Sequence, residues 1–171
     1  MKKNHLAVLL PCLLLFAACS KTKDIAPPAV PAQTWIFKGA TYNTVICFAD
    51  TVTNNLGVHA NNGSVQDSTN YSAILVNFYG AALPTSNGTY SVALVNTPVT
   101  SLTRTQVTIS FTLGGRTNVY QSTGGNGNET VSVSISNGKL SILGAGIELE
   151  NYNSSTAIDS AALSFNITEA Q

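Results

Sequence analysis

The sequence has 171 residues, of which only 9% are charged, and its eight basic residues balance its eight acidic ones. A soluble domain usually has about 25% charged residues, so this surface is expected to be wetted mainly by hydroxyl and amide groups. The chain has no basic stripe, which argues against nucleic acid as a partner.

The first 18 residues have the pattern of a signal peptide. Lys2 and Lys3 are followed by an apolar run, Leu6 to Phe16, which is shorter than the ~20 residues that a membrane-spanning helix needs. The run leads into Phe16-Ala17-Ala18-Cys19, which resembles the lipobox of bacterial lipoproteins, where signal peptidase II cuts before a lipid-bearing cysteine. The alternative is an ordinary secretory signal with an incidental cysteine.

Cys19 is therefore the expected lipidation site and the first residue of the mature protein. A cysteine suits this role because its thiolate is a nucleophile, and two or three acyl chains hold a protein at a membrane almost permanently. Ser20, rather than Asp, follows Cys19, which resembles outer-membrane sorting in bacterial lipoproteins. We expect a protein anchored by lipid to the outer membrane, on either its periplasmic or its surface face.

Residues 19–34 are expected to form a tether, and residues 35–171 a single domain. The stretch from Lys21 to Thr34 contains Pro27, Pro28 and Pro31 but no Gly. At ~3.1 Å per residue in a polyproline conformation, it would hold the domain up to roughly 40 Å from the lipid.

From Trp35 onward, short runs alternate apolar and polar residues between clusters of Gly, Asn and Ser, a pattern that predicts β-strands. The clearest case is the segment 130–143, where Asn137-Gly138 suits a type I′ turn and pairs Ile135 with Leu140. Residues 55–67 and 122–128 read as loops. Nine or ten strands predict an all-β fold, either an antiparallel β-sandwich or, as the alternative, a closed antiparallel β-barrel.

The residues expected in the core are the apolar members of these alternating runs. They are Ile74, Val76, Phe78, Tyr90, Val92, Leu94, Val107, Ile109, Phe111, Leu113, Val133, Ile135, Leu140, Ile142, Ile147, Leu149, Leu163, Phe165 and Ile167. Cys47 has no disulfide partner once Cys12 is removed and Cys19 is lipidated, so we expect it to be a buried hydrophobe.

The sequence contains no pattern typical of catalysis or metal binding. His59 is the only histidine after the signal peptide, and no Gly-x-Ser-x-Gly motif accompanies it. Glu148 and Glu150 point to one side of a strand, as ordinary solvated residues do. The segment 124–131 resembles one unit of a calcium-binding repeat, but a single copy cannot stack. We therefore predict no catalytic residue, no metal and no cofactor.

Three triplets in the domain resemble the Asp-Ser/Thr acceptor of the general O-glycosylation system in Bacteroidota periplasms. The acceptor residues would be Thr51, Ser68 and Ser160. Ser68 is the favoured one because it lies in the polar segment 61–70, where a glycan would cost no packing.

Short motifs are spread along the domain: Trp35, Gly39 and Thr41-Tyr42, then Gly88-Thr89-Tyr90, then Tyr120-Gln121-Ser122. With the lipobox, they make the chain from residue 35 to 168 resemble small β-rich lipoproteins of Bacteroidota-type bacteria. The resemblance implies a lipid-anchored β-domain and no particular activity.

These patterns favour a non-enzymatic envelope or binding module, with the membrane, glycans or other envelope proteins as candidate partners. A carbohydrate-binding or adhesive domain is the alternative, and exposed aromatic residues would favour it. An envelope glycan hydrolase is a further one. The aromatic candidates are Trp35, Tyr42, Tyr120 and Tyr152, and a hydrolase would need a cleft holding at least two of Asp50, His59, Asp67, Glu148 and Glu150.

The lipidation site can be tested by metabolic labelling. Cells that express the whole chain should incorporate a palmitate analogue into it, and Cys19→Ala should abolish the label because no other residue offers the required thiolate next to the cleavage site. Equal labelling of the two proteins would contradict the assignment.

Overall fold

The computed structural model describes residues 29–51, 56–80, 82–98, 101–115, 118–124, 127–153 and 159–170. The signal peptide, Cys19 and the first part of the tether lie outside these residues. Within them, no helix has the length and apolarity to cross a membrane. The described strands are β1 (Thr34–Phe37), β2 (Ala40–Asn43), β3 (Ile46–Asp50), β4 (Gly57–Asn61), β5 (Ser72–Phe78), β6 (Gly88–Val92), β7 (Gln106–Leu113), β8 (Val119–Ser122), β9 (Thr130–Ser136), β10 (Lys139–Asn151) and β11 (Ser160–Thr168).

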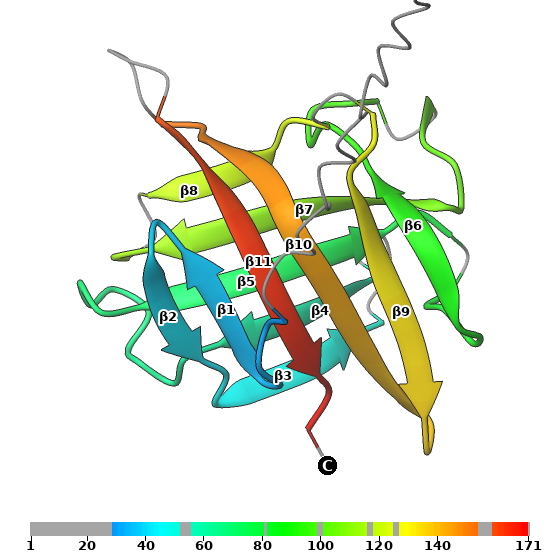
Figure 1. Ribbon diagram of the computed structural model, residues 1–171, viewed down its shortest axis with the longest axis horizontal. Coiled ribbons are helices and arrows are strands. Elements are labelled where there is room, and N and C mark those ends of the chain that lie inside the picture. The colour runs from blue at the N-terminus through cyan, green and yellow to red at the C-terminus, as the bar shows by residue number, and fades with distance from the viewer. Residues whose placement is uncertain are drawn as a thin grey trace, which may run out of the picture.

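The strands form one continuous sheet that folds over into two layers. The pairing order is β2-β1-β11-β10-β9-β6-β7-β5-β4-β3, and β8 pairs with both β10 and β7. Figure 1 shows β1, β11, β10 and β9 in a first layer, crossing a second layer of β7, β5, β4 and β3 at a steep angle. The structure confirms the predicted all-β fold and fits a β-sandwich whose layers are linked by β6 on one side and β8 on the other.

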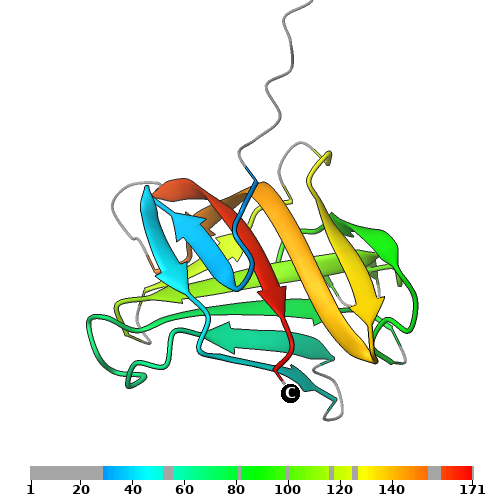
Figure 2. The same ribbon diagram turned by 60° about the horizontal axis from the view of Figure 1, so that its bottom comes forward.

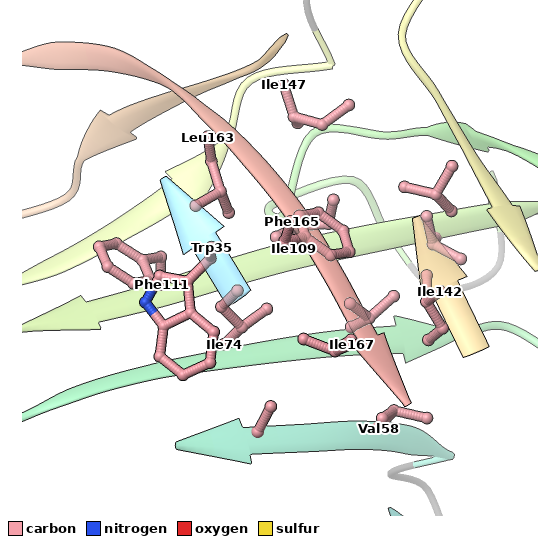
Figure 3. Packing of buried hydrophobic residues seen from close by; sticks show 14 of the residues in the cluster. Trp35, Val58, Ile74, Ile109, Phe111, Ile142, Ile147, Leu163, Phe165 and Ile167 are labelled. Atoms are coloured by element: carbon pink, nitrogen blue, oxygen red, sulfur yellow. The ribbon is translucent and has the colours of Figure 1, made fainter. Parts of the chain in front are cut away.

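The core fills the space between the layers, as the alternation of each strand requires. Figure 3 shows part of this cluster, in which side chains of β1 and β11 lie over those of β5 and β7. Phe37 of the first layer contacts Phe111 and Tyr120 of the second, with ring centroids 4.7 and 4.8 Å away. At ~25 cal/mol per Å² of apolar area removed from water, this burial is the main stabilising term.

The β9–β10 hairpin confirms the predicted register. Ile135 is opposite Leu140, and both Asn137 and Gly138 have the positive φ of a type I′ turn. β10 continues for thirteen residues, with a register shift against β11 between Gly144 and Ile147. Before the shift β10 pairs with β9, and near its end it pairs with β8, so the bulged strand serves both layers.

Several sequence predictions are wrong in detail. The segment 55–67, which reads as a loop, contains β4. The strand was missed because Val58 and Ala60 are the only apolar residues of β4 and give a weak alternation. Leu94 is exposed rather than buried, since β6 ends at Val92. There are eleven strands instead of nine or ten in the described part of the chain, and the β6–β7 pair is parallel.

The described chain begins against the first layer. Val30 is buried, and its carbonyl accepts a hydrogen bond of 3.2 Å from the Asn166 amide on β11. The Gln33 side chain bonds both the carbonyl and the amide of Thr168, at 3.0 and 3.2 Å. Contacts to the domain therefore start at Val30, a few residues before the boundary that the sequence suggests.

Gly144 has a packing role that a substitution should reveal. A Cβ at this position would lie 2.7 Å from Cζ of Phe165, so Gly144→Ala should destabilise the protein by about 1–3 kcal/mol through overpacking. Urea unfolding measures the change, and Leu143→Ala on the same strand is the exposed control. The double variant Gly144→Ala/Phe165→Leu should be more stable than additivity of the two single changes requires; strict additivity would refute the close contact.

Candidate functional site

A hollow of about 500 Å³ lies on the outer face of the second layer, over β3, β4, β5 and β7. This volume is within the ~300–1,000 Å³ range of small-molecule sites. Figure 2 shows this layer on the side of the molecule opposite to β1 and β11. The residues that line the hollow are Ile46, Phe48, His59, Ala60, Asn61, Gly63, Ser64, Gln66, Tyr71, Ala73, Ile74, Leu75, Ser110 and Thr112.

The strand register explains the floor of the hollow. Because strand partners stand side by side on one face, each set of partners forms a row of outward-pointing residues across the four strands. One row is Phe48, His59, Leu75 and Ser110, and the neighbouring row is Ile46, Asn61, Ala73 and Thr112.

The apolar part of the floor is exposed to an unusual degree. Ile46 is 46% exposed and Phe48 is 48% exposed, and the two side chains share the outer face because they are two residues apart on β3. Val45, just before the strand, is exposed as well. Contiguous exposed apolar residues are costly in water and typically mark a binding surface.

Phe48 is held by a ring stack with His59. The two ring centroids are 5.2 Å apart and the planes are within 5° of parallel. Burial lowers the pKa of His59 from its ordinary 6.5, and this outweighs the opposite effect of Asp50, whose carboxylate is 3.7 Å from Nε2. The imidazole is therefore neutral near pH 7, and the ring of Phe48 packs against an uncharged aromatic ring.

One wall of the hollow is built by a turn after β4. The Asn61 side chain accepts a hydrogen bond from the amide of Gly63, and the Asn62 side chain bonds the carbonyl of Asn70 and the amide of Ser72. Gly63 has a φ of +74°, and a Cβ there would lie 2.9 Å from the Val45 side chain. Only glycine suits both the positive φ and the close approach to Val45. The turn therefore packs directly against the residue that precedes β3.

The acidic groups that a hydrolase would use do not gather in the hollow. Among the described lining residues there is no Asp or Glu. Glu150 belongs to the same outer row as His59 but is four strands away, a path of about 19 Å along the sheet at ~4.8 Å per strand. Paired carboxylates of glycosidases are about 5–9.5 Å apart. Of the five residues that a hydrolase could have used, the described structure brings Asp50 and His59 within ion-pair distance of each other.

A second polar cluster joins Lys38, Tyr120 and Asp159 at the side of the sandwich. The Lys38 ammonium donates to both Asp159 oxygens at 2.6 and 2.8 Å and to the Tyr120 oxygen at 2.9 Å. The Tyr120 hydroxyl donates to Asp159 at 2.7 Å, and the ammonium lies 4.8 Å from the centre of its ring. The cluster ties the β1–β2 turn to β8 and to the start of β11, which is a structural role.

These contacts shift the pKa of both charged groups. Hydrogen bonds from Lys38 and Tyr120 lower the pKa of Asp159 from its ordinary 3.8. Burial lowers the pKa of Lys38, but its hydrogen bonds to Asp159 and Tyr120 outweigh burial and raise it above 10.5. Both groups are charged across the neutral range.

The aromatic platform considered from the sequence does not form. Trp35 and Tyr120 are buried, and Trp35 stacks on the half-buried Tyr42, so these rings pack the core; only Tyr152 is exposed. Cys47 is buried as expected, and burial raises the pKa of its thiol to about 12.

The three predicted glycosylation residues lie in different surroundings. Thr51 and Ser160 are exposed. The favoured one, Ser68, is half-buried, and its hydroxyl oxygen is shielded from solvent within a turn closed by Tyr71. A glycan on Ser68 would require this turn to open. Modification of all three residues stays a prediction.

The calcium-repeat resemblance falls partly outside the described residues, at 125 and 126. Glu129, which replaces its aspartate, accepts a hydrogen bond of 2.7 Å from the amide of Glu148. Across the described ranges, no three His, Cys, Asp or Glu side chains come close enough to hold a metal ion.

Sequence reasoning missed the outward role of Ile46 and Phe48. The run from Val45 to Phe48 reads as a buried strand, but the alternation Ile46-Cys47-Phe48 leaves only the cysteine facing inward. The usable signal was Asp50, which continues the Ile46 and Phe48 side and marks it as the solvent side.

The chain matches no protein-family model, no curated protein and no solved structure at a significant level.

The Asp159 cluster predicts a pH dependence of stability. Because the folded state lowers the pKa of Asp159, its contribution is fully present above the unfolded value near 3.8 and is lost as the pH falls through the lower folded value. Asp159→Asn should therefore be less stable than wild type at pH 6, and the difference should shrink towards pH 2 in urea unfolding. Tyr120→Phe, which keeps the ring, should show a smaller effect; a pH-independent difference for Asp159→Asn would disprove the linkage.

Proposed function

We propose that this protein is a non-enzymatic binding module, anchored by lipid at Cys19 to the bacterial outer membrane, which uses the hollow as its binding face. The observation that supports the proposal most directly is the exposure of Ile46 and Phe48 side by side on the floor of the hollow. A fold that otherwise buries most of its large apolar residues gains nothing in stability from this arrangement.

The features of the hollow favour binding over catalysis. Its lining offers ring, amide and hydroxyl groups, while glycoside hydrolysis typically uses a pair of carboxyl groups at close range. The glycan hydrolase alternative would have to draw on Asp50 and His59 alone, and His59 Nε2 is shielded from solvent.

The binding role can be tested without the lipid. The mature chain from Ser20 onward, produced without the signal peptide and Cys19, carries no lipid, so its association with washed envelopes reports on ligand binding. We expect saturable association, weakened at least about tenfold by a Phe48→Asp change, because a charge replaces an apolar contact. Leu143→Asp is the matched control, since Leu143 is 43% exposed on β10, away from the hollow.

Two results would refute the proposal. One is the absence of saturable envelope association of the lipid-free mature chain. The other is an equal effect of Phe48→Asp and Leu143→Asp, which would separate the association from the hollow.

A further inference from the structure

The hollow combines an apolar floor with uncharged polar groups. Phe48 and Leu75 supply apolar surface, while Asn61 and Thr112 supply amide and hydroxyl groups beside them. None of the described lining residues is Lys, Arg, Asp or Glu. Since burial also keeps His59 neutral, the lining residues carry no charge, and the Asp50 carboxylate lies beside His59 without lining the hollow.

We infer that the hollow binds an uncharged saccharide, with the apolar face of one sugar ring lying on Phe48. This inference rests on the proposed function and names the ligand class for the same site. A pyranose has a face of C–H groups and a rim of hydroxyls, so it matches a flat aromatic surface that is bordered by hydrogen-bonding groups. A purely apolar ligand would leave the amides and hydroxyls without partners.

The recognition surface is already in place before any ligand arrives. The stack on His59 fixes the ring of Phe48, and the hydrogen bonds of Asn61 and Asn62 fix the adjoining wall. Little side-chain entropy remains to be lost on binding, which matters for a ligand that makes few strong contacts.

A peptide that adds a strand beside β3 is a weaker candidate. Such a peptide would need the free backbone groups of the edge strand. In this fold the amide of Ala170 donates to the carbonyl of Cys47 at 2.9 Å, so the C-terminal residues cover part of that edge. The outer face of β3, in contrast, stays open at Ile46 and Phe48.

A glycan array tests the inference. The whole chain, purified in a detergent without a sugar head group, is applied to neutral oligosaccharides with sulfated and sialylated glycans beside them. We expect binding to a subset of the neutral glycans. Phe48→Ala should weaken it at least about tenfold, a change of ~1.4 kcal/mol, which one aromatic contact can supply.

Two further variants separate the ring contact from general effects on folding. Phe48→Tyr keeps the aromatic face and should keep the binding. Tyr152→Ala removes an aromatic residue that is 64% exposed and does not line the hollow, so it should bind as the wild type does.

The outcomes distinguish this inference from the proposed function. Binding only to charged glycans, or binding that Phe48→Ala leaves unchanged, would overturn the saccharide assignment. An empty array together with envelope association that depends on Phe48 would overturn it as well, while the binding module would stand. Loss of both signals would refute the two together.

Discussion

The close contact between Gly144 and Phe165 is the constraint on which the two-layer arrangement depends. The ring of Phe165 occupies the place where any other residue at position 144 would have its Cβ. Directly after this contact β10 shifts its register against β11, and the strand bends from β9 towards β8. Because β8 also pairs with β7, this single bent strand connects the first layer to the second.

The bend in turn sets which surfaces are inside. Once β10 and β8 link the layers on one side, β7 and β5 must face β1 and β11 across the core, and their other faces become solvent-exposed. The Lys38, Tyr120 and Asp159 cluster reinforces the same side, where it joins the β1–β2 turn to β8. In the part of the chain that the structure describes, no element covers the outer rows of β3, β4, β5 and β7, and the hollow lies there.

Local patterns predicted those parts of the fold that depend on local chemistry. The β9–β10 hairpin could be read from Asn137-Gly138 because turn geometry and alternation require the same register. The link through β8 could not be read, since its four residues have only a short apolar alternation and its partner β10 is not its neighbour in the chain. The ion pair of Lys38 with Asp159, 121 residues apart, has no sequence signal at all.

The hollow could not be predicted from the sequence for a related reason. Each of its strands shows its own alternation, but which faces remain uncovered is decided by the order of strands in the sheet. Cys47 could be assigned to the core from its apolar neighbours, whereas Ile46 and Phe48 look equally apolar and point the other way. A one-residue difference in phase separates core from binding surface in such a strand.

The described N-terminal segment and the hollow lie on opposite layers of the sandwich. Val30 and Gln33 are held at β11 in the first layer, and the hollow lies on the outer face of the second. Figure 2 shows these two sides of the sandwich facing opposite ways. The described chain therefore enters the domain at the layer opposite to the hollow, so the proposed lipid anchor at Cys19 would be joined to that layer. A ligand in the surrounding medium could then reach Phe48 without displacing any part of the chain that the structure describes.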